Sequence, residues 1–234
     1  MSLTSDEIKQ KVGRAAADLV QPGMRIGLGT GSTVYWLIEE LGLKIKQGLK
    51  ITAVPTSSET ERLAKAAGIP LSDLDAIDLL DLDIDGADEI DPSGQLIKGG
   101  GGALLQEKIV AHASRELIVI ADASKLVSQL GVMALPIEVI PFGEKQVTEH
   151  ILQYSNCRKV TLRQKGGHPF LSDHGHHILD CHYDKIADAK WLNDFLHAVP
   201  GVVETGLFLG MASSSLIGFA DGRIESYQYK TGRE

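Results

Sequence analysis

Short apolar segments alternate with helical segments along the first 130 residues, and this alternation constrains the fold more than any other feature of the chain. The expected strands cover residues 24–28, 51–55, 76–84 and 116–121. The expected helices cover residues 4–20, 34–43 and 102–114, together with a segment that Ser57 or Ser58 caps and that ends at Ala67. Strands that alternate with helices at this spacing form a parallel sheet covered on both faces. We therefore predict an α/β fold with a mostly parallel sheet.

The pattern changes after about residue 130, where polar, turn-rich connections separate shorter elements. Strands are expected at 136–140, 159–162 and 177–181, and helices at 144–154 and 185–197. This mixture is typical of a small α+β domain. We predict that residues 131–206 form such a domain, inserted into an α/β catalytic domain made of residues 1–130 and 207–234.

Charge and composition exclude several classes of protein. The net charge of −8 argues against nucleic-acid binding, because no basic stripe is present to neutralise phosphates. No apolar run approaches the ~20 residues that a membrane helix needs, and the polar, acidic N-terminus does not resemble a signal peptide. Cys157 and Cys181 are too few for a disulfide framework and lack metal-ligand spacing, so we expect two reduced thiols in a cytoplasmic protein.

Gly27–Thr33, with the sequence GLGTGST, stands between an expected strand and an expected helix. Glycines let the backbone approach an anion closely, and the first N–H groups of the helix, with the hydroxyls of Ser32 and Thr33, are suited to hold a phosphate. The segment is not a dinucleotide fingerprint, because Ser32 replaces the third glycine, and not a P-loop, because no lysine precedes Ser32. A tight turn with Ser32 as a helix cap is the alternative.

The stretch Asp81–Asp91 contains six acidic residues within eleven positions. Asp85 and Asp88 are three residues apart at the expected carboxyl end of a parallel strand, the edge at which ligands bind in open α/β sheets. Close carboxylates can act as an acid–base pair. In a continuous strand Asp81, Asp83 and Asp85 share one face, with the apolar side chains on the other. A solvated acidic loop is the alternative; the spacing does not fit an EF-hand.

Lys98 and the four glycines that follow it lie between two apolar segments. They form either a flexible linker or a nest of backbone N–H groups around a developing oxyanion, with Lys98 adding a full charge. Glu107, early in the next helix, is either paired with a surface lysine or a general base in a closed site. Lys125 follows another strand and could reach the same anion, and Lys9 is a weaker candidate of the same kind.

Five of the eight histidines fall between residues 168 and 182. His174, His176 and His177 suggest a metal site, but their position across a turn and a strand favours exposed histidines of a hairpin. We therefore predict no metal.

The segments GTGST, DGADEID, KGGGGALLQEK and DASK occur in this order, and with them the sequence resembles ribose-5-phosphate isomerase, type A. The segment PGVVETGLF at 200–208 is similar to the family's return from its small domain, so the resemblance covers nearly the whole chain. The tail after Leu209 and the histidine-rich small domain depart from the family, which puts oligomer contacts in doubt rather than the reaction.

The resemblance implies an aldose–ketose isomerase that interconverts D-ribose 5-phosphate and D-ribulose 5-phosphate without metal or cofactor. It implies a Rossmann-like α/β domain with a small α+β domain, in a homodimer or homotetramer. Glu107 is then the proton acceptor, and the other catalytic residues are Asp85, Asp88 and Lys98. The implied substrate contacts are Thr30, Gly31, Ser32, Thr33, Asp85, Gly86, Ala87, Asp88, Lys98, Gly99, Gly100, Gly101, Lys125 and Lys9. The phosphate is expected near the turn at 30–33. Asp81 and Asp83 are then expected to be strand and edge residues, and Glu89 and Asp91 to be turn residues.

Three other readings remain to be separated from this one. A coenzyme A transferase or an amino-sugar phosphate isomerase/deaminase would share the fold. A sugar-phosphate-sensing module of a regulator would normally carry a helix-turn-helix, for which no basic segment of about 50 residues is present. A bare dinucleotide-binding domain is disfavoured by Ser32.

Overall fold

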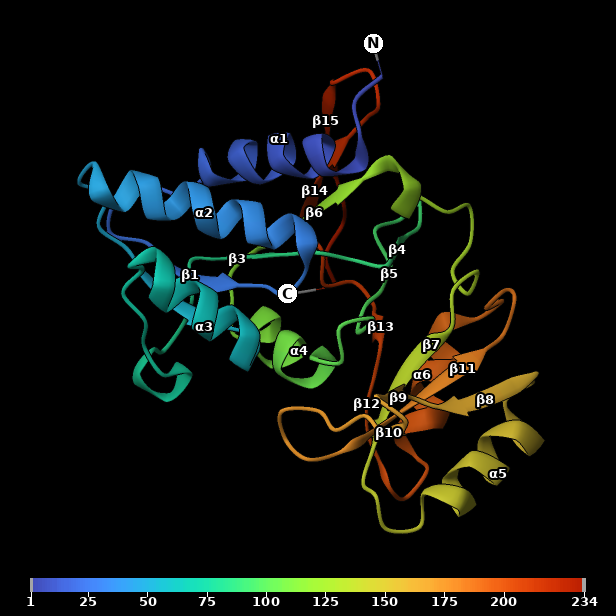
Figure 1. Ribbon diagram of the computed structural model, residues 1–234. Coiled ribbons are helices and arrows are strands. Elements are labelled where there is room, and N and C mark those ends of the chain that lie inside the picture. Colours follow the sequence, from blue (N-terminus) through green and yellow to red (C-terminus); the bar gives the residue numbers. More distant parts are fainter. Residues whose placement is uncertain (1, 233–234) are drawn as a thin grey trace. The chain divides into compact units, whose positions relative to one another are not determined.

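The computed structural model describes residues 2–232, and the chain forms two compact units (Figure 1). Unit 1 comprises residues up to Ala87, Gln106–Lys125 and the residues from Gly210 onward. Unit 2 comprises Asp88–Leu105 and Leu126–Leu209. Unit 2 thus extends beyond the expected 131–206, because the short strands β4 (Glu89–Ile90) and β5 (Leu96–Ile97) pair with β13 (Leu207–Phe208). We keep the division into two domains as a proposal.

Unit 1 is built on a six-stranded sheet in the order β15-β14-β6-β3-β1-β2, in which only β15 is antiparallel to its neighbour. The strands are β1 (Arg25–Leu28), β2 (Thr52–Pro55), β3 (Leu82–Asp85), β6 (Leu117–Asp122), β14 (Ser214–Gly218) and β15 (Ile224–Gln228). The helices are α1 (Ser5–Ala17), α2 (Ser32–Lys46), α3 (Ser58–Ala67), α4 (Leu104–His112), and the 3-10 turns η1 (Leu74–Ala76) and η2 (Ala123–Lys125). The predicted α/β fold with a mostly parallel sheet is confirmed.

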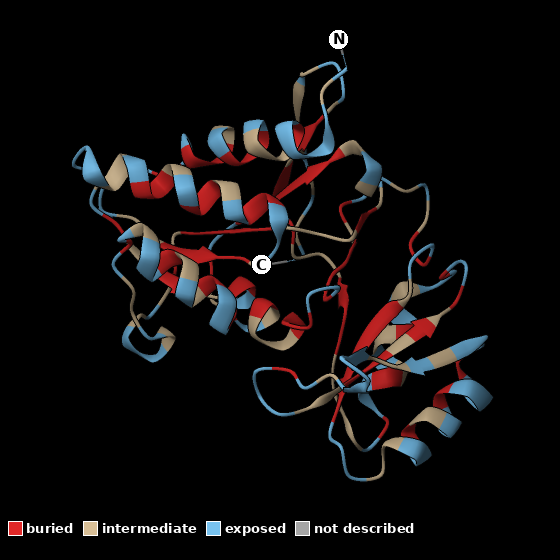
Figure 2. Cartoon of the chain, viewed as in Figure 1, coloured by how far each residue is buried: buried red, intermediate tan, exposed pale blue. Residues whose placement is uncertain are grey.

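The sheet of unit 1 is covered on both faces. Helices α1 and α2 lie on one face and α4 lies on the other (Figure 1). The apolar core between the sheet and α1 and α2 takes Ile8 and Val12 from α1, Leu37 from α2 and Ile26 from β1. Buried residues line the strands and the inner sides of these helices (Figure 2). Burying a leucine or isoleucine side chain contributes about 1.5–3 kcal/mol, so this core is the main source of stability.

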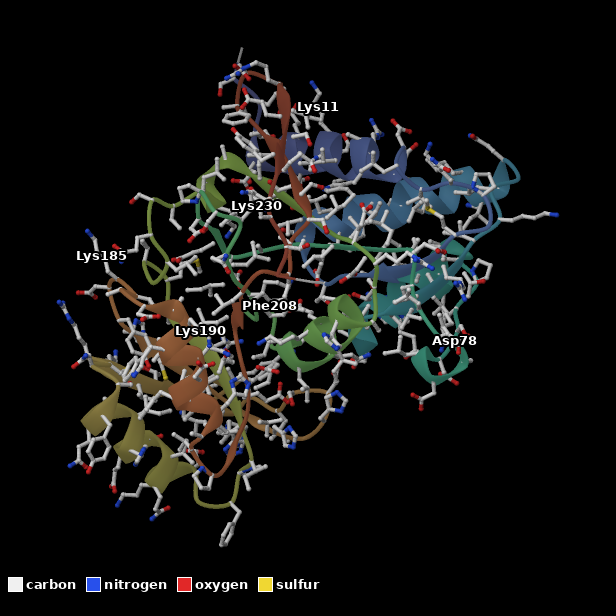
Figure 3. The ribbon with its side chains drawn as sticks, turned by 180° about the vertical axis from the view of Figure 1, so that it is seen from behind. Lys11, Asp78, Lys185, Lys190, Phe208 and Lys230 are labelled. Carbon is white, nitrogen blue, oxygen red and sulfur yellow. The ribbon has the colours of Figure 1, made fainter. Side chains whose placement is uncertain are left out.

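Helix α1 begins with the capping box that its sequence predicts. The Glu7 N–H donates to Thr4 Oγ1 at 3.4 Å, and the Thr4 N–H donates to Glu7 Oε2 at 2.8 Å. The Thr4 hydroxyl also donates to Glu7 Oε2 at 2.8 Å, and the two bonds that this carboxylate accepts from the Thr4 N–H and hydroxyl lower the pKa of Glu7. Further along α1, Lys11 Nζ donates to the carbonyl of Gly222, between β14 and β15, at 3.0 Å (Lys11 is labelled in Figure 3). The N-terminal helix is therefore tied to the β14–β15 hairpin.

Unit 2 contains a four-stranded antiparallel sheet, in the order β12-β7-β11-β8, packed against two helices. These elements are β7 (Leu135–Val139), α5 (Glu144–Tyr154), β8 (Lys159–Leu162), β11 (His177–His182), α6 (Ala189–His197) and β12 (Val202–Thr205), with a hairpin of β9 (Gln164–Lys165) and β10 (His168–Pro169). Its core joins Ile137, Ile151, Leu179 and Leu196.

In unit 1, the strand predicted at 76–84 begins only at Leu82, because residues 74–76 make a 3-10 turn.

The two cysteines of unit 2 are both free and buried, which agrees with the expected thiols. A hydrogen bond from Cys181 lowers the pKa of Cys157 to about 7, against the opposing effect of burial. Burial raises the pKa of Cys181 well above its usual value. Within residues 2–232 there is no helix of the length and apolar character that crossing a membrane requires.

Candidate active site

The glycine-rich turn between β1 and α2 is anchored to the end of β3. The Gly29 N–H donates to the Ile84 carbonyl at 3.0 Å, and the Thr30 N–H donates to Asp85 Oδ1 at 2.9 Å. The N–H of Gly86 donates to the same carboxylate oxygen at 2.7 Å. Asp85 is fully buried. Its carboxylate therefore joins two loops at the carboxyl edge of the parallel strands, the edge at which ligands bind in such sheets.

Only glycine fits at position 29. A Cβ there would lie 2.1 Å from Asp85 Oδ1 and 2.5 Å from the Asp85 Cα. Because the Cα belongs to a central strand, rotation of a side chain cannot relieve the clash. We expect Gly29→Ala to lower the free energy of unfolding by about 1–3 kcal/mol, measured by urea denaturation. Gly86→Ala, whose added Cβ would meet nothing closer than 3.6 Å, is the control, and an equal loss in both variants would contradict the prediction.

The start of α2 presents backbone donors rather than a side-chain cap. Gly31 is the N-cap, with φ 134°, and no side chain caps the helix. Ser32 is the first residue of α2, so the alternative in which Ser32 caps this helix is wrong. Gly31 and Ser32 are exposed, whereas Thr33 is buried. A helix N-terminus with exposed N–H groups attracts anions, which fits the phosphate role expected for this turn.

The hydroxyl groups of Thr56, Ser57 and Thr60, none of which was predicted to belong to the site, contact the Thr30 hydroxyl of the turn. Thr30 Oγ1 lies 2.8 Å from Thr56 Oγ1, 2.8 Å from Ser57 Oγ and 3.1 Å from Thr60 Oγ1. The Thr60 hydroxyl donates to the Gly29 carbonyl at 2.7 Å. Ser57 also caps α3, as one of its two predicted caps. Their position in the sequence could have indicated this role, because these hydroxyls directly follow β2, whose carboxyl end lies at the same edge of the sheet as the turn.

The carboxylates of β3 and of α4 lie on the same face of the sheet. A Cβ at Gly27 would lie 2.5 Å from both Asp83 Oδ1 and Val110 Cγ1, so Asp83 projects toward the face that α4 covers. Asp85 shares that face because it is two residues further along the strand. Glu107 is three residues before Val110 on α4, hence on the same side of that helix, and its side chain is only 3% exposed. The predicted alternation along β3 is confirmed, with Leu82 and Ile84 in the opposite core.

Two of the candidate lysines occupy positions consistent with an anion at the carboxyl edge. Lys125 ends η2, directly after β6, the neighbour of β3. Lys9 lies on α1 between Asp6, which accepts from Trp36 Nε1 at 3.3 Å, and Gly13, which packs on Trp36. Since α1 and α2 run in the same direction, Lys9 is level with the first turns of α2.

Unit 2 carries the remaining predicted residues, Asp88, Lys98 and the glycine run, on the β4–β5 hairpin and the turn after it. The Asp88 N–H donates to the Ile97 carbonyl at 2.8 Å, and Asp88 Oδ2 accepts the Gly100 N–H at 2.7 Å. Lys98 is 2% exposed, and its ammonium lies 5.4 Å from the ring centroid of Phe208, which is labelled in Figure 3. The carboxylate, the cation and the glycines are thus assembled in one place.

The glycine run is a turn, not a linker. The Gly102 N–H donates to the Gly99 carbonyl at 2.9 Å, which closes a β-turn with Gly100 and Gly101 at its exposed centre. Gly99 has φ 99° and Gly102 has φ 83°, values that favour glycine. A Cβ at Gly102 would also lie 2.4 Å from the Phe170 ring. The linker alternative is wrong for this segment.

One of the predictions for the acidic residues needs correction. Glu89 is not a turn residue: it is 1% exposed in β4, and its carboxylate accepts the N–H of Gly131 at 2.7 Å and that of Met133. Asp91 is a turn residue, accepting from Ser93 and Gln95. Asp81 lies at the edge before β3 beside Arg25, whereas Asp83 is a strand residue with no exposure.

The histidine-rich segment also differs from its expected exposed hairpin. His174 is exposed, but His176 and His177 are half-buried, each beside a carboxylate. His176 Nδ1 lies 2.9 Å from Glu138 Oε1, and His177 Nδ1 lies 2.6 Å from Glu144 Oε2. No group of three or more histidine, cysteine, aspartate or glutamate side chains with a metal-binding arrangement occurs among residues 2–232.

Known proteins match the chain over nearly its whole length. The model of the family described as ribose 5-phosphate isomerase A (phosphoriboisomerase A) matches residues 52–222. Ribose-5-phosphate isomerase A of Bacillus mycoides is 56% identical over 221 residues, which are 94% of this chain and 99% of that protein. The enzyme of the same name from Ruegeria pomeroyi is 50% identical over 227 residues, which are 94% of this chain and 86% of the relative.

Solved structures of ribose 5-phosphate isomerases have the same fold as this chain. The ribose 5-phosphate isomerase of Plasmodium falciparum superposes with a TM-score of 0.93 at 39% identity, covering 96% of this chain and 99% of that one. A D-ribose-5-phosphate isomerase in complex with phospho-erythronic acid superposes with a TM-score of 0.92 at 36% identity, covering 97% and 100% of the two chains.

Proposed function

The chain belongs to the ribose 5-phosphate isomerase A family, and from this premise we propose which residues carry the reaction. The enzyme is an aldose–ketose isomerase that interconverts D-ribose 5-phosphate and D-ribulose 5-phosphate. The reaction moves one proton between C1 and C2 of the open-chain sugar. A base that takes the C2 proton leaves an enediolate, and return of the proton to C1 completes the ketose. The site must therefore supply a proton carrier and a group that stabilises the oxyanion.

Glu107 is the proton carrier in this proposal. The observation that carries the assignment is a carboxylate that is 3% exposed, in the first turns of α4, on the sheet face toward which Asp83 and Asp85 project. A carboxylate at this position can accept a proton from carbon and return it to the neighbouring carbon, which is the task of a general base in this reaction. Asp85, with Oδ1 held by two backbone N–H groups, transfers the hydroxyl protons and assists ring opening.

Lys98 and the turn at 99–102 stabilise the enediolate in this proposal. A buried ammonium acts on a developing negative charge with little screening, and backbone N–H groups of a turn form an oxyanion cradle. Asp88 orients this turn through its bond to the Gly100 N–H. Phospho-erythronic acid, the ligand of a relative, carries carboxylate oxygens where the enediolate carries O1 and O2, so we propose that it binds this site as an analogue of the intermediate.

The turn at 30–33 holds the phosphate in this proposal. Its support is the exposed start of a 15-residue helix, with Lys9 level with the first turns. Lys125 is a further substrate contact. Gly86 and Ala87, after β3, and Gly99–Gly101 line the sugar. The partner is thus a small sugar phosphate, not a nucleic acid or a membrane.

We also propose that the enzyme is a cytoplasmic homodimer or homotetramer. The support for the oligomer is the family resemblance, and the support for the compartment is the pair of free, buried thiols. Light scattering after size-exclusion chromatography tests the oligomer.

Turnover of ribose 5-phosphate should proceed at the same rate in EDTA, because Lys98 and backbone N–H groups meet the charge of the enediolate in place of a metal ion. The measurement is a coupled assay of ribulose 5-phosphate formation, with and without EDTA and with added Mg²⁺ or Zn²⁺. Activity lost in EDTA and restored by a divalent ion would overturn the metal-free mechanism. Acyl transfer from coenzyme A in the same preparation would instead favour the transferase reading.

A further inference from the structure

Arg163, more than 60 residues further along the chain, donates hydrogen bonds to the backbone of the glycine turn. Arg163 follows β8 and its side chain is 16% exposed. Its Nη1 donates to the Gly99 carbonyl at 2.9 Å and to the Gly100 carbonyl at 3.1 Å. Its Nε donates to Asp180 Oδ2 at 2.9 Å, and Nη2 donates to Asp180 Oδ1. The guanidinium therefore spans a carboxylate of β11 and two consecutive carbonyls of the turn.

The grip on the carbonyls determines where the N–H groups of the turn point. No cis peptide bond occurs among the described residues, and in a planar trans peptide the C=O and the N–H point in opposite directions. Because Arg163 holds the Gly99 carbonyl, the N–H of Gly100 points away from it, and this N–H donates to Asp88 Oδ2 at 2.7 Å. Because Arg163 also holds the Gly100 carbonyl, the N–H of Gly101 points away from the guanidinium as well.

We infer that Arg163, locked by Asp180, is a positioning residue for catalysis that aims the Gly101 N–H of the oxyanion cradle and keeps the Gly100 N–H on Asp88. The inference rests on the proposed role of the glycine turn. Four successive glycines have more conformational freedom than any other run of residues, so an oriented cradle needs an external clamp. A charge-assisted bond to a carbonyl also polarises the peptide, which makes the N–H of the same unit a stronger donor.

The clamp requires an arginine rather than another cation. The planar fork of arginine can bind a carboxylate through two nitrogens and still direct a third N–H group to the turn, whereas lysine offers a single point of charge. The guanidinium lies 5.9 Å from the ring centroid of Phe170, and this ring is the group that a Cβ at Gly102 would strike. Arg163, Asp180 and Phe170 thus hold the turn from one side, and Asp88 holds it from the other.

The test compares Arg163→Ala, Arg163→Lys and Asp180→Asn with Arg158→Ala. Arg158 is the control because it precedes the same strand, its side chain is 70% exposed, and it pairs with Asp184 outside the turn. In Arg163→Ala we expect kcat to fall about 10- to 100-fold with little change in KM, the size of effect that a misplaced catalytic group produces. Affinity for phospho-erythronic acid should fall by a similar factor. Arg163→Lys should behave like Arg163→Ala, and Asp180→Asn should show a smaller loss of the same kind.

Guanidinium ion added in solution should restore part of the turnover of Arg163→Ala and none of any loss in Arg163→Lys, where the lysine fills the space. A purely structural role would lower the melting temperature without rescue and without a selective loss of the analogue. Wild-type kcat in folded Arg163→Ala, or a loss that appears in KM alone, would overturn the inference. The outcome is separable from the proposed function, since wild-type turnover in Glu107→Gln would overturn the proposed proton carrier, whatever Arg163 does.

Discussion

Replacing Glu107 with glutamine should reduce kcat by about two to four orders of magnitude, the usual contribution of a general base. This corresponds to about 3–5 kcal/mol of transition-state stabilisation. The substitution keeps the shape of a side chain that is 3% exposed and removes its charge, so folding and KM should change little. What is lost is the group that accepts the proton from C2.

Proton transfer from carbon can be measured separately from the other steps. In D2O the wild-type enzyme should introduce deuterium at C1 of ribulose 5-phosphate, and NMR should show this exchange falling with kcat in Glu107→Gln. Glu138→Gln is a control matched for burial, since Glu138 is 1% exposed and is bound by Ser172 and His176 in unit 2. Glu107→Gln with near wild-type exchange, or Glu138→Gln with an equal loss per folded molecule, would contradict the assignment.

The sequence predicted the parts of this site that depend on local pattern. The alternation of Leu82, Asp83, Ile84 and Asp85 is a period-2 pattern, and the structure places the two carboxylates on one face as expected. The capping box at Thr4 and the strand–turn–helix unit at Gly27–Thr33 are likewise local. Each of these is decided by neighbours a few residues apart, so its signal survives in the linear sequence.

The parts that sequence did not predict depend on contacts between distant residues. Strands β4 and β5 have two residues each, too few to show a period, and their pairing with β13 moves residues 88–105 into unit 2. Glu89 resembles its acidic neighbours in the sequence, yet it is buried because it accepts N–H groups 42 and 44 residues away. The sequence left the glycine run open between a linker and a cradle, and it did not predict the contact with Arg163, which is 63 and 64 residues away from Gly100 and Gly99.

Replacing Lys98 with methionine should reduce kcat by about two to three orders of magnitude, as the loss of an oxyanion-stabilising group does. Methionine keeps most of the volume of a side chain that is 2% exposed and removes the ammonium, with its charge and its N–H donors. The expected loss is large because a buried charge acts through a low effective dielectric, whereas an exposed lysine is screened by water. Lys190→Met, on the solvent side of α6 where Lys190 pairs with Asp194, is the control and should be silent.

The affinity for phospho-erythronic acid distinguishes stabilisation of the intermediate from simple substrate binding. A cation that acts mainly on the enediolate binds the analogue more tightly than the sugar, because only interactions stronger in the transition state than in the ground state raise kcat. In Lys98→Met the analogue should therefore lose affinity in proportion to kcat, while KM for ribose 5-phosphate moves little. A rise in KM with unchanged kcat would instead make Lys98 a ground-state contact. In that case the charge of the enediolate would have to be met by the N–H groups of the turn that Arg163 holds, and the Arg163 variants would then show the larger loss of kcat.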